Sequence, residues 1–171
     1  MEFTCHTTYD QKALTAMARA VRKTVRAKRN RCIHLNTWIM IALLLVSLWL
    51  CWGDIWQTAL HCTVIAVLLL ITWKEDALNA FFAKRKAMPG TDAANTEFFS
   101  DHFLTKSNAA ESKWQYDKIL ALAETRDYLV FIMGKDHALA VEKATLKGGS
   151  VPEFCCFVEE KTGRKIQNVG G

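Results

Sequence analysis

The groups in this chain that could bind a metal or attack a substrate are its histidine and cysteine side chains. Two Cys–His pairs stand close in the sequence, Cys5 with His6 and Cys32 with His34, and each could supply two ligands to a zinc ion. A structural zinc site needs four ligands at characteristic spacings, and the sequence has no C-x-x-C. We therefore expect no metal site, and we interpret the cysteines as buried or interfacial free thiols.

Acid–base and nucleophilic catalysis are not indicated either. Serine, histidine and aspartate all occur, but no G-x-S-x-G, H-E-x-x-H, Walker or G-x-G-x-x-G motif arranges them. Glu153, Glu159 and Glu160 belong to a predicted solvated helix face. Gly148–Gly149 precedes that helix, whose N-terminus could bind an anion, but Ser150 and Glu153 are expected to cap it. The sequence thus predicts a protein that is not an enzyme, with no catalytic residue and no cofactor.

Two long apolar runs dominate the elements that would position any site. They cover Ile33–Trp52 and Ile55–Trp73, and Asp54 is the only formal charge between Ile33 and Trp73. Each run has about the 20 residues that a helix needs to cross ~30 Å of hydrocarbon. Core helices of soluble proteins need only about 10–14 such residues, and a signal peptide would not be followed at once by a second span. The sequence predicts a transmembrane helical hairpin.

The flanking charges predict the orientation of this hairpin. The first 32 residues carry eight basic and two acidic side chains, further basic residues follow the second run, and the connecting turn has none. The positive-inside bias therefore predicts a multi-pass protein of the cell membrane with both termini in the cytoplasm. Residues 90–171 hold 10 basic and 12 acidic side chains. This near-neutral balance predicts no nucleic-acid partner.

The segment before the first run predicts a short extended stretch and then a basic amphipathic helix. Glu2–Thr7 is extended, and Thr8 with Gln11 has capping-box spacing at the start of an uninterrupted helix. The cations on its polar face are expected to contact the anionic inner leaflet of the bilayer. Alternatively, its apolar stripe packs on the cytoplasmic domain and the cations only set the topology. The cations concerned are Arg19, Arg22, Lys23, Arg26 and Arg29.

Aromatic and polar side chains in the runs suggest membrane contacts. Trp49, Trp52 and Trp56 cluster around the outer turn, where indole rings favour the headgroup region. His61 is a polar candidate within the membrane, and such ionisable groups are functional candidates by default. A structural role is the alternative, in which His61 hydrogen-bonds across the hairpin to Ser47 or points toward the interface.

The rest of the chain predicts a strand-rich domain. Short strand-like segments follow one another and favour an antiparallel meander, covered by a helix that a Ser150–Glu153 capping box starts and Gly163 ends. The expected strands are Thr96–Phe99, His102–Thr105, Ser112–Tyr116, Ile119–Ala123, Tyr128–Met133 and His137–Val141. The expected divisions are 1–31, strand and helix; 32–74, hairpin (33–52 and 55–73); 75–95, connecting helix and linker; 96–165, cytoplasmic domain; and 166–171, a frayed tail.

This order of elements resembles the bacterial YcxB-like membrane proteins. The resemblance lies in Glu97–Ser107 (EFFSDHFLTKS), Trp114–Ile119 (WQYDKI), Thr125–Ile132 (TRDYLVFI) and His137–Lys143 (HALAVEK), and it covers about Thr96–Lys161. It implies a fold similar to the bacterial pleckstrin-homology-like (PH-like) domain, a bent antiparallel sheet or small barrel capped by one helix. It also implies that the N-terminal extended segment joins that sheet, with the hairpin as an insertion.

The resemblance transfers no catalytic residues, and the strand loops lack the dense Lys/Arg cluster that phosphoinositide recognition would need. The leading hypothesis is a non-enzymatic protein that anchors a cytoplasmic interaction or scaffold domain at the inner leaflet. Such a domain would contact a second copy or another protein through a sheet edge. One alternative is a membrane immunity or envelope stress-response protein. The other is an oligomeric transporter or channel component that uses His61.

Overall fold

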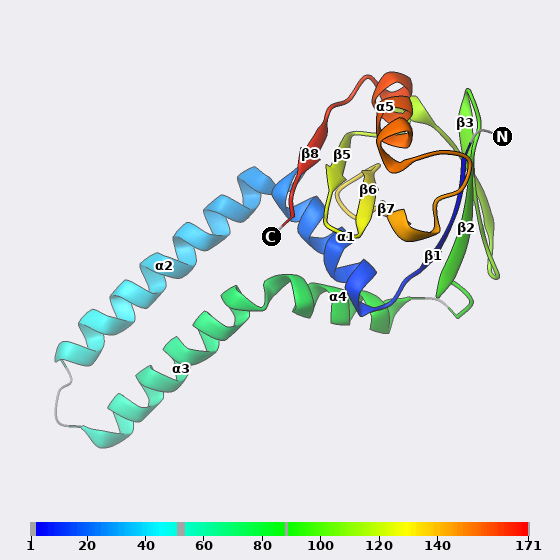
Figure 1. The fold of residues 1–171 in the computed structure, drawn as a ribbon. Helices are drawn as coiled ribbons and strands as arrows, with labels where there is room; N and C mark the ends of the chain where they lie inside the picture. The colour runs from blue at the N-terminus through cyan, green and yellow to red at the C-terminus, as the bar shows by residue number, and fades with distance from the viewer. Residues whose placement is uncertain (1–2, 51–53, 88, 171) are drawn as a thin grey trace.

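A computed structural model describes residues 3–50, 54–87 and 89–170 of the chain. Figure 1 shows a helical hairpin that projects from a domain of strands and helices. The elements in chain order are β1 (Phe3–Thr8), α1 (Gln11–Lys23), α2 (Ala27–Leu50), α3 (Ile55–Trp73), α4 (Glu75–Lys86), β2 (Ala93–Phe98), β3 (His102–Ser107), β4 (Glu111–Gln115), β5 (Ala121–Glu124), β6 (Tyr128–Ile132), β7 (Ala138–Glu142), α5 (Val151–Thr162) and β8 (Ile166–Asn168). Single turns of 3-10 helix follow β4 and β7.

The strands form two four-stranded sheets, and the α+β class with antiparallel sheets is confirmed. One sheet has the order β1-β2-β3-β4 and is antiparallel throughout. The other has the order β7-β6-β5-β8, in which only the β5–β8 pair is parallel. Strands β1 and β7 meet where the sheets approach each other, and the Glu142 N–H donates to Thr7 Oγ1 at 3.1 Å. The hairpin is therefore inserted between two paired strands, β1 and β2.

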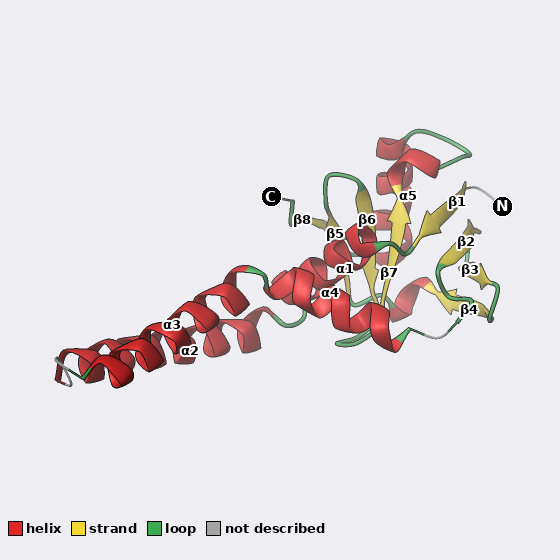
Figure 2. Cartoon of the chain, turned by 90° about the horizontal axis from the view of Figure 1, so that it is seen from below, coloured by secondary structure: helices red, strands yellow, loops and turns green. Residues whose placement is uncertain are grey.

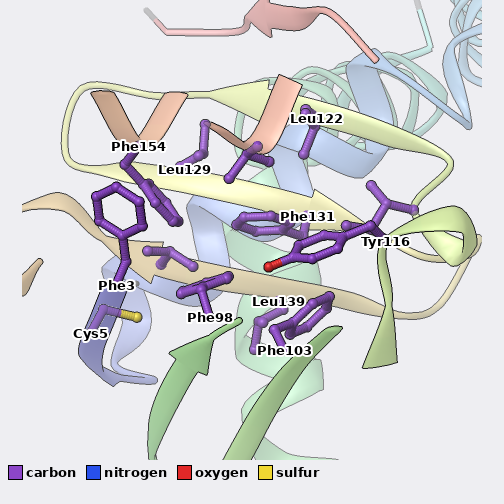
Figure 3. Close-up of a cluster of buried hydrophobic side chains, with 13 residues drawn as sticks. Phe3, Cys5, Phe98, Phe103, Tyr116, Leu122, Leu129, Phe131, Leu139 and Phe154 are labelled. Carbon is purple, nitrogen blue, oxygen red and sulfur yellow. The ribbon is translucent and has the colours of Figure 1, made fainter. Parts of the chain in front are cut away.

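A continuous apolar run accounts for the position of β6 in the middle of the domain. All five of its residues are buried, because alternate side chains enter different cores. Leu129 and Phe131 pack between the two sheets with α5, as the close-up of this cluster illustrates (Figure 3). Tyr128, Val130 and Ile132 pack on the opposite face, against α1. The sheet that contains β6 is thus a central layer, with the other sheet and α5 on one side and α1 on the other.

The helix before the hairpin departs from the expectation at both ends. Asp10 caps α1 by accepting from the Ala13 N–H at 2.8 Å, so Thr8 is not the cap. Helix α1 ends at Lys23 instead of continuing into the first apolar run. At Thr24 the backbone leaves the helical region and the hydroxyl donates to the Ala20 carbonyl at 2.7 Å. Such side-chain bonds to the backbone compete with helix continuation, and a turn therefore separates α1 from α2.

The connecting helix expected within 75–95 is α4, which packs beside α1, and the segment after it is the linker. Two other expectations are wrong. Strand β2 begins at Ala93, not Thr96, because its register with β1 extends to the Thr8–Ala93 pair. The tail is not frayed: β8 pairs with β5, and the buried Val169 donates its N–H to the Glu124 carbonyl at 2.8 Å. The domain therefore includes both ends of the chain.

The terminal helix α5 agrees with its sequence signals. Ser150 Oγ accepts from the Glu153 N–H at 3.4 Å, and the Glu153 carboxylate accepts from the Ser150 N–H at 2.7 Å. Gly163 follows at φ +62°, a left-handed conformation that glycine adopts without steric cost. The capping box and the stop residue are both confirmed.

The hairpin exposes apolar surface along its length. Helices α2 and α3 have 24 and 19 residues, and their most apolar windows both have a mean hydropathy of 1.9. They lie side by side in both ribbon views, away from the sheets (Figures 1 and 2). Of the residues described in these two helices, only Ile41 is buried. Both helices are long and apolar enough to cross a membrane.

Candidate functional site

The base of the hairpin, where α1, α2 and α4 meet, gathers charged side chains from distant parts of the sequence. Helices α1 and α4 pack side by side there, and the Gln11 amide donates to the Ala77 carbonyl at 3.1 Å. Because α2 follows α1 and α4 follows α3, this pair of helices holds both ends of the hairpin.

Asp76 is the centre of an ion-pair cluster at the base. Its carboxylate accepts from Arg22 Nε at 2.6 Å and Arg22 Nη2 at 2.7 Å, and from Arg19 Nε at 3.4 Å. Two parallel bonds from one guanidinium are the strong form of this contact. The hydrogen bonds from Arg22 to Asp76 raise the pKa of that guanidinium further above its ordinary value. Glu75 lies beside the pair, 3.8 Å from Arg22 Nε and 3.2 Å from His34 Nε2 of α2.

These contacts show where the cations predicted to touch lipid are held. Arg19 and Arg22 face Asp76, while Lys23 Nζ donates to the Val169 carbonyl at 3.3 Å. The apolar side of α1 packs on the domain, as the alternative expected: Ala13, Ala20 and Val21 are buried in the core beneath β6. That the cations only set the topology stays a prediction. Lipid contact by Arg19, Arg22 and Lys23 stays a prediction.

The remaining two cations of that set lie farther along the chain. Arg26 pairs with Asp136 in the turn between β6 and β7. Arg29 is exposed on the first turn of α2 and forms no ion pair within the part of the chain that the structure describes. The acidic partners of these cations, Glu75, Asp76 and Asp136, were not predicted from the sequence. A signal for two of them exists, because Glu75 and Asp76 directly follow an apolar run in a chain with many basic residues before that run.

The aromatic and polar residues of the hairpin lie as follows. Trp49 and Trp56 are exposed near the distal end, and Trp52 lies outside the described residues. His61 Nε2 is 3.0 Å from Ser47 Oγ across the hairpin, which confirms the predicted pairing. His61 Nδ1 is 2.6 Å from the Gln57 carbonyl, which can only accept, so we assign the donor role in this contact to Nδ1. His61 therefore joins α2 to α3.

The two Cys–His pairs do not converge on a common point. Cys5 is buried and His6 is exposed, because successive side chains of β1 point to opposite faces. Cys32 and His34 are two positions apart on α2, a spacing that places side chains on different sides of a helix. Among the residues described, no three His, Cys, Asp or Glu side chains gather as metal ligands would.

We expect Cys5 to react far more slowly than Cys156 with a thiol-alkylating reagent at pH 8. Burial raises the pKa of the Cys5 thiol to about 11, outweighing the hydrogen bonds with Thr7 and Thr96, which lower it. Since the thiolate is the nucleophile, only about one in a thousand Cys5 thiols would be reactive at pH 8. Cys156 is exposed on α5. Mass spectrometry of single-cysteine variants measures both rates, and equal rates in the folded protein would contradict this burial.

A sheet edge is the other feature with functional potential. Strand β4 pairs with β3 along one side, and no described strand pairs with its other side. Ser112 and Trp114 are half-buried, and Glu111, Lys113 and Gln115 are exposed. An unpaired edge offers backbone hydrogen-bonding groups to an added strand.

Comparisons with protein-family models, with curated proteins and with solved structures found no match to this chain. The geometry of the hairpin, its base and the sheets therefore carries the functional inference.

Proposed function

We propose that the chain is a non-enzymatic integral membrane protein whose hairpin anchors a PH-like interaction domain at the inner leaflet of the cell membrane. The observation that carries this proposal is the exposure of the hairpin. Side chains such as Leu43, Val46, Leu60 and Leu70 are 55–65% exposed, and none of the described residues covers them. Burying such surface in hydrocarbon is favourable by about 25 cal/mol per Å².

The arrangement of strands supports the PH-like part of the proposal. Two antiparallel meanders, β2-β3-β4 and β5-β6-β7, are followed by the single helix α5, which covers the core between the sheets. Strand β1 extends the first meander from the far side of the hairpin. The pairing of β1 with β2 on either side of the inserted hairpin agrees with one feature that the resemblance implies, and β1 and β8 both lie in the domain, on the side with the basic flanks.

Chemical labelling in intact cells tests the anchoring and the orientation together. We expect a cysteine introduced by Asp54→Cys to react with a membrane-impermeant maleimide from outside, since this residue precedes α3 at the distal end of the hairpin. Cys156 should react only after permeabilisation, because α5 lies in the cytoplasmic domain. Each cysteine is tested in a chain lacking the others. Release of the protein from membranes by alkaline carbonate, or the reverse labelling pattern, would overturn the proposal.

The interaction partner is proposed to add to the exposed edge of β4. A photo-crosslinker attached through Gln115→Cys should capture a second copy or another protein in membranes, since Gln115 is exposed on this strand. Lys118→Cys is the matched control, because Lys118 is exposed in the turn just beyond β4. Equal capture at both positions would contradict an interface at the edge.

A further inference from the structure

A cavity of about 590 Å³ lies at the base of the hairpin. It is bounded by α1, the first turns of α2, α4 and the turn that joins β6 to β7. This volume is within the range of pockets that hold small molecules. Apolar side chains form much of its wall, notably Leu14, Met17, Val21, Ile33 and Phe82. The cavity therefore offers an apolar wall against which the apolar part of a ligand can pack.

Cationic side chains outnumber carboxylates around the cavity. The charged residues that line it are Arg22, Arg26, Arg29, Lys86 and Lys135, opposed by Glu75 and Asp136. Arg22 and Arg26 are engaged in ion pairs. Within the described ranges, Arg29, Lys86 and Lys135 form no ion pair. The cavity thus has a net positive charge, and three of its cations are available to an anion.

Arg26 has a hydrogen-bond donor to spare. One terminal nitrogen of its guanidinium pairs with Asp136, but Nε is buried and has no partner among the described residues. A buried donor without an acceptor is unfavourable. An anionic oxygen in the cavity would offer this guanidinium the acceptor that Asp136 does not supply.

The cavity also lies where the apolar surface of the hairpin begins. Arg29 is one helical turn before Ile33, the first residue of the apolar run, and Ile33 is 50% exposed. Phe82 of α4 is 54% exposed on the opposite wall. A ligand that fits this arrangement has an anionic head next to an apolar tail.

We propose that this cavity binds the headgroup of an anionic glycerophospholipid. The phosphate lies against Arg29, Lys86 and Lys135, and the acyl chains leave along Ile33 and Phe82 toward the hydrocarbon. A zwitterionic lipid is disfavoured because its ammonium group would face the same cations. The inference rests on the proposed membrane insertion, and it adds a lipid-specific site between helices to the general attraction between the basic flanks and the leaflet.

The test uses the full chain in nanodiscs of phosphatidylcholine doped with phosphatidylglycerol. Native mass spectrometry counts the lipids that stay bound when the protein is released. We expect the wild-type protein to retain phosphatidylglycerol over phosphatidylcholine, and the R29Q/K86Q variant to lose that preference by about thirtyfold, as two cations near a lipid surface would account for.

A matched control separates the cavity from general surface charge. The R31Q/K84Q variant removes one arginine from α2 and one lysine from α4, like the test variant, but neither residue lines the cavity. We expect this variant to keep the lipid preference of the wild type. Equal loss in both variants, or retention in both, would overturn the lipid site. Lys135→Gln, in a turn outside the helices, is the second variant and should reduce the preference about fivefold.

Two further measurements show whether the bound anion is a lipid or a soluble phosphate, and whether a negative result concerns membrane insertion or the lipid site. Inorganic phosphate and glycerol 3-phosphate are added in excess, and displacement of the bound lipid by either would contradict the lipid assignment. Failure of the full chain to enter nanodiscs would overturn both the proposed function and the lipid site. Insertion without a preference for phosphatidylglycerol would overturn the lipid site alone.

Discussion

Replacing Phe131 with alanine is expected to lower the free energy of unfolding of the domain by about 3–5 kcal/mol, the usual cost of truncating a core phenylalanine. Phe131 is fully buried in the middle of β6. Its ring centroid lies 5.7 Å from that of Phe98, 5.8 Å from Phe103 and 6.3 Å from Phe154. The truncation would leave a cavity where both sheets and α5 meet, and none of these elements can close it without losing its own contacts.

Pulse proteolysis of the full chain in detergent, over a urea series, measures this loss in the domain. Leu120→Ala is the matched control, because Leu120 is a large apolar residue just before β5 and is 49% exposed. The control should cost less than about 1 kcal/mol. Equal urea midpoints for the two variants would contradict the placement of Phe131 at the centre of the core.

Asp76→Asn should have the second largest effect, a loss of about 2–3 kcal/mol. The Asp76 side chain is only 12% exposed and accepts from Arg22 and Arg19. Removing its charge leaves the Arg22 guanidinium near the protein interior without the carboxylate that accepts its two short bonds, and breaking a fully buried pair costs about 3–5 kcal/mol. The partial exposure of Arg22 reduces that figure. Because Asp76 joins α4 to α1, we also expect faster protease cleavage near the base of the hairpin.

The control for this substitution is Asp117→Asn, which removes the same charge from an exposed ion pair with Lys118. Surface pairs contribute at most about 1 kcal/mol. Thermal unfolding in detergent, followed by near-ultraviolet circular dichroism, compares the two variants. A melting temperature of Asp76→Asn that matched that of Asp117→Asn would show that the base of the hairpin does not depend on this cluster.

Local signals in the sequence were sufficient for the elements that depend on near neighbours. The apolar run at Tyr128–Met133 predicted a strand, and the structure buries that strand on both faces. The Ser150–Glu153 capping box and Gly163 predicted both ends of α5. The Ser47–His61 contact followed from two helices joined by a short turn, since such a connection brings positions near the turn together.

Distant partners account for the predictions that failed. Nothing near residues 166–168 indicates a strand, because β8 forms only through its pairing with β5. The start of β2 depends on β1, which is almost 90 residues away in the sequence: Thr8 pairs with Ala93. The ion pairs of Asp76 with Arg19 and Arg22 likewise depend on the packing of α4 against α1, two helices that are about 50 residues apart in the chain.

An apolar hairpin, alternating strands and a capped terminal helix could be predicted from the residues alone, because these features depend on composition and on spacings within a few residues. Three features became evident only in the folded arrangement: β1 and β8 complete the sheets, Asp76 accepts hydrogen bonds from Arg19 and Arg22, and a cationic cavity opens beside Ile33. These features join residues far apart in the chain. Their formation depends on the packing of whole helices and sheets, and no local sequence pattern predicts that packing.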